Sequence, residues 1–291
     1  MKKKILFILN PKAGTGFNTE ISAIIKRSCN KNDFDAEIIF TERAGHAIEL
    51  AAEAVKNKFD IVAATGGDGT INEVAQSLKN TNTALAIIPT GSGNGFARHF
   101  NIPLNMEKAI TVIKKGNMVN VDSLLINGKF CMNIAGAGFD AYIAHLFANY
   151  GKRGFISYIK LVMKEYFSYK QKNYTIEFDG KKINTTAFLI AIANASQFGN
   201  GAKIAPLAGV NDGIIDVTIL KKIPFYQIVF VMVKLFNGKL AGSAYAEIIR
   251  SKSFIISSDQ EIITHIDGEP GDSCNEIVAT VDPLSVKLIV P

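Results

Sequence analysis

The chain has 291 residues, a length that fits two domains better than one. Its composition, with 48% hydrophobic and 20% charged residues, supplies enough apolar side chains for buried cores and excludes a disordered chain. The net charge of +6 suits an anionic partner such as a nucleotide, a nucleic acid or a lipid headgroup, although many proteins carry such an excess without functional meaning.

The first 122 residues alternate between strand and helix signals. An apolar run at residues 5–9 follows three lysines, but it is shorter than the hydrophobic region of a signal peptide, so we interpret it as a buried strand. Further strands are expected at 36–40, 61–64 and 84–88, and helices at 17–30, 46–56 and 72–78. This alternation predicts an α/β domain, an open parallel sheet with helices on both faces.

Residues 123–291 have a different pattern, in which short β-rich segments are separated by Gly, Asn and Asp. Strands are expected at 123–126, 130–135, 174–178, 186–194, 214–220, 254–258, 261–266 and 286–290. Asn127-Gly128 and Asp179-Gly180 are hairpin turn signals, and helical stretches lie near 142–169 and 224–240. The second half therefore predicts an antiparallel β-sandwich, which makes the fold class α/β plus all-β, with a cleft expected between the domains.

The most informative motif follows the strand at 61–64 and opens a helix. It reads Gly66-Gly67-Asp68-Gly69-Thr70-Ile71-Asn72-Glu73. Backbone N–H groups at a helix N-terminus attract anions, and glycines let a phosphate approach the backbone closely. A carboxylate at Asp68 would repel phosphate unless a metal ion accompanies it. The motif thus indicates a site for phosphate and metal, with a simple turn as the alternative.

Two further glycine loops follow the strands at 84–88 and 5–9. They read Pro89-Thr90-Gly91-Ser92-Gly93-Asn94-Gly95 and Asn10-Pro11-Lys12-Ala13-Gly14-Thr15-Gly16. Loops at the carboxyl ends of neighbouring parallel strands face one crevice, which is where open sheets bind ligands. None of the loops ends in Gly-Lys-Ser/Thr, so a P-loop enzyme is excluded.

The acidic candidates of the second half are Asp212-Gly213 and Asp267-Gly268-Glu269. Acids beside a phosphate site can hold a metal ion or take a proton from an attacking hydroxyl. On spacing alone, hairpin turns explain both segments more simply.

Taken in order, the segments 66–73 and 89–94 and the Asp267-Gly268-Glu269 triplet resemble the diacylglycerol kinase catalytic-domain family, which includes bacterial lipid kinases, sphingosine kinases and ceramide kinases. Further matches are Asn10-Pro11 with Gly14, Thr41 ahead of Gly45, 136–140 and 200–216. The resemblance covers nearly the whole chain. It implies a fold like that of NAD kinase and phosphofructokinase, with a nucleotide-binding domain at 1–122, a β-sandwich domain at 123–291 and the active site in the cleft between them.

The resemblance also implies a magnesium-dependent transfer of the γ-phosphate of ATP to a lipid hydroxyl. Asp212 would hold magnesium with the backbone carbonyls of Gly209 and Ile214. Glu269 would be the general base, with Asp267 as the alternative, and Asp68 would lie near the metal and phosphates. The residues that would contact ATP are Asn10, Gly14, Thr41, Gly66, Gly67, Asp68, Gly69, Thr70, Ile71, Asn72 and Ser92.

Two positions depart from the family pattern. Ser92 stands where the family usually has Thr, so the hydroxyl is kept. Gly95 stands where the family often has Asp, so any contact of that carboxylate is lost.

Aromatic and basic residues are interleaved in the two helical stretches of the second half. In 142–169 the basic residues are Lys152, Arg153, Lys160 and Lys164, while 224–240 is apolar on most faces. Such stretches suit an anionic membrane surface, although they are equally suited to covering the sandwich core. We expect a membrane lipid acceptor, peripheral membrane contact, no nucleic acid partner and a possible homodimer.

The cysteines indicate the cellular compartment, and the histidines indicate whether a zinc site is present. The three cysteines (Cys29, Cys131 and Cys274) are scattered, as a reducing compartment permits, and the four histidines do not cluster as zinc ligands would. No window of about 20 apolar residues predicts a membrane-spanning helix. We therefore expect a cytoplasmic protein located at the inner face of the membrane.

Two rival functions remain open at this stage. A kinase with a soluble acceptor, of the NAD kinase type, would share the Gly-Gly-Asp-Gly turn, but the downstream Asp-Gly-Glu triplet favours the lipid branch. A catalytically silent nucleotide-binding regulator is the other rival. Asp68, Asp212 and Glu269 argue against it because a silent protein needs none of these carboxylates.

Overall fold

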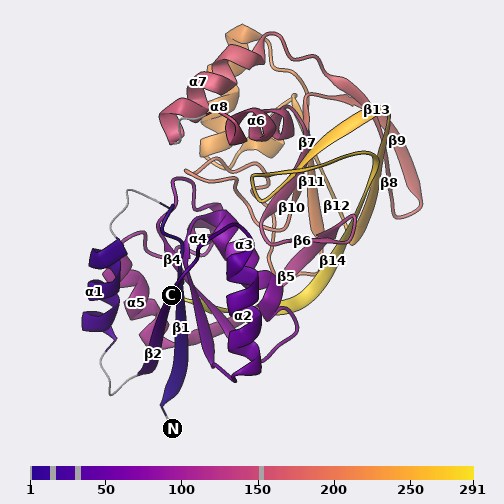
Figure 1. Ribbon diagram of the computed structural model, residues 1–291. Helices are drawn as coiled ribbons and strands as arrows, with labels where there is room; N and C mark the ends of the chain where they lie inside the picture. Colours follow the sequence, from indigo (N-terminus) through magenta and orange to yellow (C-terminus); the bar gives the residue numbers. More distant parts are fainter. Residues whose placement is uncertain (1, 14–17, 30–33, 151–153) are drawn as a thin grey trace. The chain divides into compact units, whose positions relative to one another are not determined.

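The computed structural model describes residues 2–13, 18–29, 34–150 and 154–291 (Figure 1). The chain forms two compact units. Unit 1 consists of Met1–Val121 together with Leu284–Pro291, and unit 2 consists of Asp122–Pro283.

Unit 1 is the predicted parallel α/β sheet. Its strands are β1 (Lys3–Leu9), β2 (Phe34–Phe40), β3 (Ile61–Gly66) and β4 (Ala84–Pro89), hydrogen-bonded in the order β4-β3-β1-β2. The β1–β2, β1–β3 and β3–β4 pairs are all parallel. The central strands β3 and β4 are buried along their whole length, whereas β2 at the edge is largely exposed. This explains why continuous apolar runs predicted the central strands.

Helices cover both faces of this sheet. They are α1 (Asn18–Ser28), α2 (His46–Lys56), α3 (Asp68–Leu78), α4 (Gly95–His99) and α5 (Met106–Lys115). Figure 1 shows α1 and α5 on one side of the strands and α2 and α3 on the other. Helix α5 is not among the predicted elements, although its start is capped by Asn105, whose side chain accepts a hydrogen bond from the Lys108 N–H.

The last strand differs from expectation. The sequence pattern places residues 286–290 in the antiparallel half. In the structure they form the end of the long strand β14 (Glu269–Val290), and Leu288 pairs in parallel with Leu85 of β4. Val286, Leu288 and Ile289 are buried in unit 1. An apolar strand pattern shows that a segment is buried but not which sheet it joins.

Unit 2 contains most of the antiparallel strands, as predicted. They are β5 (Asn117–Ile126), β6 (Lys129–Cys131), β7 (Ile134–Gly138), β8 (Lys172–Phe178), β9 (Lys181–Ala187), β10 (Leu189–Ala193), β11 (Ile215–Leu220), β12 (Ala246–Ser251) and β13 (Ser253–Ile266), with the first part of β14. The β5–β6 and β8–β9 hairpins turn at Asn127-Gly128 and Asp179-Gly180. All four turn residues have positive φ, as this type of tight hairpin requires.

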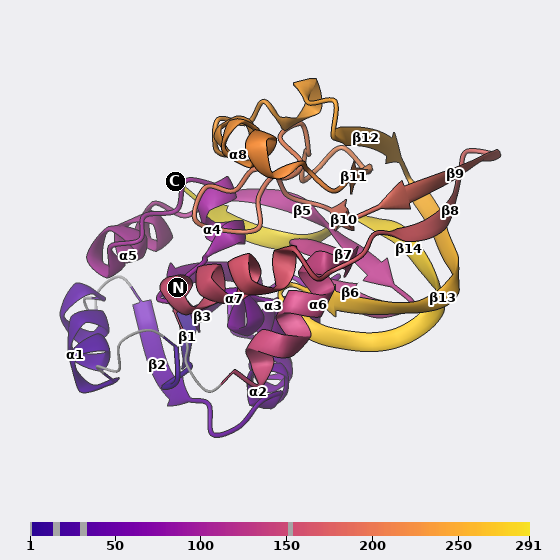
Figure 2. The same cartoon turned by 90° about the horizontal axis from the view of Figure 1, so that it is seen from above.

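Two apolar cores lie on opposite faces of β10. Ile190 and Ile192 belong to the core of the sandwich. Leu189, Ala191 and Ala193 face the other core. That second core is covered by the helices α6 (Phe139–Ala148), α7 (Phe155–Tyr166) and α8 (Ile228–Phe236). The period-2 alternation of a strand thus gives unit 2 a sandwich on one face of the sheet and helices on the other (Figure 2).

Short 3₁₀ turns lead into and out of α8, at η1 (Phe225–Gln227) and η2 (Leu240–Gly242). Within the described ranges, no helix combines the length and the apolar character needed to span a membrane.

Candidate active site

The predicted nucleotide residues of unit 1 lie where its parallel strands end. The Asn10 N–H donates to the Thr65 carbonyl at 3.0 Å, which joins the ends of β1 and β3. The Thr41 N–H, just after β2, donates to the Leu9 carbonyl at 2.8 Å. The carboxyl edge of the sheet therefore brings these loops together, as expected for an open α/β sheet.

The glycine loop at 66–69 and the glycine loop at 89–95 touch through their backbones. A Cβ atom added to Gly91 would lie 2.6 Å from the Cα of Gly67, so a larger residue at position 91 would push the loops apart. Asn94 holds the second loop in its turn: it has a φ of +50°, and its amide donates to the Gly91 carbonyl at 2.6 Å.

Asp68 is the first residue of α3 and is half-buried. Its carboxylate accepts hydrogen bonds from the Gly95 N–H at 3.1 Å and the Phe96 N–H at 3.2 Å. These N–H groups open α4, where a negative charge is favourable. Asp68 therefore fastens the second glycine loop to the start of α3, and a metal ion bound there would share its oxygens with these donors.

The remaining residues of the 66–72 segment form the end of β3 and the first turn of α3. Thr70 is buried, and its hydroxyl accepts a hydrogen bond from the Asn10 amide at 3.0 Å. Ile71 is buried in the core, Thr41 is buried at the end of β2, and Ser92 is exposed. The residues that complete the segment are Gly66, Gly67, Gly69 and Asn72. The predicted ATP contact at Gly14 lies outside the described residues.

Glu73, the last residue of the motif, has a role that the sequence analysis missed. Its carboxylate accepts from the Gly45 N–H at 2.9 Å and the Ala47 N–H at 3.2 Å. Both donors belong to the start of α2, so Glu73 holds the N-terminus of that helix against α3. Gly45, one of the two donors, is among the family matches in the sequence, but nothing in the sequence links it to Glu73.

In unit 2, the Asp267-Gly268-Glu269 triplet forms the turn between β13 and β14. Asp267 is buried, and its carboxylate accepts the N–H groups of Met132, Asn133 and Ile134, each at 2.9 Å. The Cys131 thiol lies 3.3 Å from the same carboxylate, and burial together with the Asp267 charge raises the thiol pKa. Both oxygens of Asp267 thus hold the connection between β6 and β7.

Glu269 has the opposite environment. It is the first residue of β14 and is exposed. Within the described part of the chain, no hydrogen bond or ion pair to its carboxylate is formed. Of the two predicted candidates for the base, Glu269 is therefore the one with an available carboxylate.

A buried pair that the sequence analysis missed supports this turn. His265 Nε2 lies 3.1 Å from the Asp140 carboxylate, and the Gly268 N–H donates to His265 Nδ1 at 3.4 Å. With Nδ1 accepting from Gly268, the neutral imidazole has its N–H at Nε2, and this N–H donates a hydrogen bond to the Asp140 carboxylate. A Cβ atom at Gly136 would lie 2.7 Å from His265 Nε2, so a glycine is needed beside the pair. The resemblance included Gly136 and Asp140, but nothing in the sequence indicated His265.

The predicted magnesium residues lie together in one loop of unit 2. The Ile214 N–H donates to Asp212 Oδ1 at 3.1 Å, and a Cβ atom at Gly209 would lie 2.8 Å from Asp212 Oδ2. Arg250, which the sequence analysis did not identify, pairs with Asp212 at 2.5 Å and with the buried Asp216 at 3.3 Å. Burial raises the pKa of Asp216, and Arg250 opposes that shift.

Among the residues predicted to hold magnesium, Asp212 alone offers a side-chain carboxylate. In the described ranges, no three or more His, Cys, Asp and Glu side chains could hold a metal ion together. The predicted site does not require such a group, because Mg²⁺ commonly binds one or two carboxylates together with substrate phosphates while keeping several waters. Gly209 and Ile214 flank the Asp212 carboxylate, and Arg250 neutralises it in this structure.

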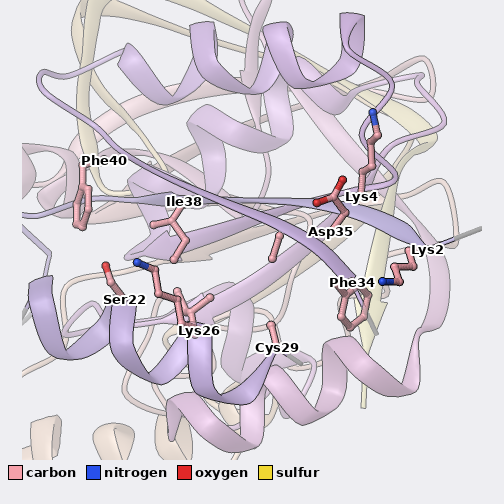
Figure 3. A pocket seen from close by; sticks show the side chains of 11 residues that line it. Lys2, Lys4, Ser22, Lys26, Cys29, Phe34, Asp35, Ile38 and Phe40 are labelled. Atoms are coloured by element: carbon pink, nitrogen blue, oxygen red, sulfur yellow. The ribbon is translucent and has the colours of Figure 1, made fainter. Parts of the chain in front are cut away.

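A separate cavity of about 950 Å³ lies in unit 1 along β2 and α1 (Figure 3). Lys2, Lys26, Phe34 and Asp35 are among its lining residues. None of the residues predicted to bind ATP lines it, so the predicted chemistry does not involve this cavity.

Comparison with known proteins covers both halves of the chain. The family model described as "Diacylglycerol kinase catalytic domain" matches residues 4–126, and the one described as "YegS C-terminal NAD kinase beta sandwich-like domain" matches residues 133–290. A diacylglycerol kinase of Bacillus subtilis is 28% identical over 92% of this chain and 90% of its own length. One from Staphylococcus saprophyticus is 27% identical over 93% of this chain and 90% of its own length.

Solved structures show the same fold. The crystal structure of a diacylglycerol kinase from Bacillus anthracis has a TM-score of 0.77, with 23% sequence identity over 99% of this chain and 97% of that one.

Proposed function

The chain belongs to the diacylglycerol kinase family, and from this premise we propose that it is an ATP-dependent kinase that phosphorylates the hydroxyl of diacylglycerol or a related lipid. The observation that carries the proposal is the contrast within one turn: Asp267 is fully engaged in holding the backbone, whereas Glu269 presents an available carboxylate.

The nucleotide is assigned to unit 1. The first N–H groups of α3 have no acceptor within the helix, and Gly67 and Gly69 leave the backbone open to a phosphate. Asn10, Thr41 and Ser92 supply polar side chains at the carboxyl ends of the neighbouring strands. Unit 1 would thus hold the phosphates by backbone amides and a helix dipole rather than by a lysine of a P-loop.

Glu269 is assigned the role of general base. Its carboxylate takes the proton of the acceptor hydroxyl as the hydroxyl oxygen bonds to the γ-phosphorus. The bond from that phosphorus to the bridging oxygen breaks, and ADP leaves with the electron pair. Asp267 and the Asp140–His265 pair position the turn that carries Glu269.

Magnesium, when bound, neutralises phosphate charge. In this chain Asp212, with the carbonyls of Gly209 and Ile214, would hold it. Asp68, which accepts from the Gly95 N–H, would lie beside the phosphates. Arg250 forms ion pairs with both Asp212 and Asp216. The proposed reaction needs ATP and magnesium, which the cytoplasm supplies. We therefore also propose a cytoplasmic location, at the inner face of the membrane.

A kinase assay with acceptor candidates tests the proposal. The purified chain, labelled ATP and magnesium are incubated with short-chain diacylglycerol, other lipid alcohols, or NAD, and the product is identified by mass. Phosphorylation of a lipid alcohol with loss of turnover in Glu269→Gln is the expected result. Turnover on NAD instead would establish the soluble-acceptor rival, and nucleotide binding without transfer to any acceptor would establish the silent regulator.

A further inference from the structure

The outward face of α8 is apolar. Val229, Phe230, Val233 and Phe236 are all exposed, Val229 to 76% of its full area. Their spacing places them on one side of the helix, and Val231 on the opposite side is buried in the helical core. A helix on the surface of a water-soluble domain ordinarily carries polar residues on its outer face, so α8 departs from that pattern.

The outward face of α7 combines apolar and basic residues. Ile156, Ile159 and Met163 are exposed along one side, Ile156 to 72%. Lys160 and Lys164 are also exposed. Ile156, Lys160 and Lys164 are spaced four residues apart, so each lies one helical turn after the one before it. Leu161 on the inner side is buried in the same core as Val231 of α8.

The two faces meet where α7 ends and η1 begins. The rings of Phe167 and Phe225 lie 5.8 Å apart, and both side chains are exposed. The Tyr166 hydroxyl donates to the Ile223 carbonyl at 2.6 Å, and Lys222 Nζ donates to the Tyr169 carbonyl at 2.6 Å. These contacts fix the end of α7 against the segment that leads into α8. Figure 1 shows α6, α7 and α8 together at one end of unit 2.

We call this the α7–α8 surface, defined by its exposed side chains Ile156, Met163, Phe167, Phe225, Val229 and Phe230. Exposed apolar side chains on two helices joined through the Phe167–Phe225 contact mark a binding surface more often than a solvent-facing one.

Positive charge is concentrated on the same segments. Residues 155–170 and 221–240 contain seven lysines and one glutamate, an excess equal to the +6 of the entire chain. The glutamate, Glu165, has a side chain only 14% exposed and lies beside Lys164 and the Tyr142 hydroxyl. The segments that carry the exposed apolar side chains are therefore strongly basic, although Lys222 and Lys234 donate to backbone carbonyls of unit 2.

We propose that the α7–α8 surface docks the protein onto an anionic bilayer, with the apolar side chains entering the interface and the lysines facing the headgroups. A second copy of the chain is a poorer occupant, because it would bring the same lysines against these. The inference extends the proposed function, since a lipid acceptor is reached at a bilayer, but its evidence comes from α7 and α8 alone.

Vesicle co-sedimentation of the full chain tests the surface without any need for activity. Vesicles of phosphatidylcholine with about one third phosphatidylglycerol are compared with vesicles of phosphatidylcholine alone. We expect binding to the anionic vesicles that weakens with salt, because screening reduces the lysine contribution. Equal binding to both vesicles, or none to either, would overturn the proposal.

Two pairs of variants locate the contact. Phe225→Ser/Phe230→Ser should weaken binding at least tenfold, whereas Leu104→Ser/Met118→Ser, which removes two exposed apolar side chains of unit 1, should leave it unchanged. Lys160→Gln/Lys164→Gln should lose about fivefold per lysine, with Lys114→Gln/Lys115→Gln as the control. Equal losses in test and control pairs would mean that binding is not located on α7 and α8.

Kinase activity and oligomeric state separate the remaining outcomes. On short-chain diacylglycerol below its micelle concentration, the surface variants should turn over like the unaltered protein. A protein that binds anionic vesicles but phosphorylates nothing would refute the proposed function and keep the docking surface. A protein that phosphorylates the lipid but does not bind vesicles would keep the proposed function and refute the docking surface.

A dimer in solution that the Phe225→Ser/Phe230→Ser variant converts to a monomer would show that a second copy covers the surface.

Discussion

Two carboxylates two positions apart in one turn have opposite environments. Asp267 is buried with three backbone N–H groups on its oxygens, and Glu269 is exposed at the start of β14. When neighbouring acids are separated in this way, their chemical roles separate as well. Asp267 shapes the turn, and Glu269 is left free to exchange a proton.

The change Glu269→Gln tests the second half of that statement. The amide keeps the size of the side chain but cannot take a proton, so turnover should fall by about 10²–10⁴-fold. The affinity for ATP, measured by calorimetry, should stay within error because the nucleotide is assigned to residues of unit 1. Unchanged turnover would remove Glu269 from the mechanism.

The change Asp267→Asn tests the first half. An asparagine has one acceptor oxygen, and its NH₂ group would face a backbone N–H that the carboxylate now accepts. Leaving such a buried donor unpaired costs about 1–3 kcal/mol. We expect a lower melting temperature for Asp267→Asn and none of this loss for Glu269→Gln. A stable Asp267→Asn variant with the larger loss of turnover would move the base to Asp267.

At the scale of elements, the first turn of α3 is tied to two other helices by its own motif. Asp68 accepts from the first N–H groups of α4, and Glu73 accepts from those of α2. Both acids therefore act on helix N-termini, where the backbone supplies unpaired donors. The motif that indicates phosphate binding also assembles the loops that would bind the phosphate.

The change Asp68→Asn should therefore affect both stability and nucleotide binding. One of the two hydrogen bonds to α4 is lost, which is worth about 1–2 kcal/mol, and the second glycine loop loosens. We expect a lower melting temperature and weaker ATP binding by calorimetry. Glu53→Gln, an exposed change on α2, should alter neither. Normal melting together with lost turnover would assign Asp68 to chemistry alone.

Element type was predictable where the local pattern and the fold agree. Buried β3 and β4 gave continuous apolar runs, and the Asn127-Gly128 turn gave a hairpin. The end of β14 was misplaced because its partner, Leu85, lies some 200 residues away in sequence. The Asp140–His265 pair was missed for the same reason: the contact joins α6 to β13, and spacing carries no information on it.

At the scale of the whole molecule, tyrosines packed in or against the cores make the fold sensitive to alkaline pH. Tyr158 packs edge-on against Phe147 in the helical core, and burial, with a smaller contribution from the Asp140 charge, raises its pKa to about 12. Burial likewise raises the pKa of Tyr169 to about 12 and raises that of Tyr174. The folded protein thus favours the neutral phenols that the unfolded chain would ionise near pH 10.

This linkage predicts the direction of the pH dependence. Because the folded pKa of Tyr158 lies above the unfolded value, its contribution to stability is complete below pH 10 and is lost as the pH rises toward 12. At about pH 11 the loss from this one group amounts to about 1.4 kcal/mol. Urea unfolding at pH 8 and pH 11 should show a smaller decrease in the free energy of unfolding for Tyr158→Phe than for the unaltered chain. Tyr226→Phe, in a side chain that is 79% exposed, should keep the full decrease. If both variants lose stability to the same extent between the two pH values, Tyr158 does not govern the alkaline transition.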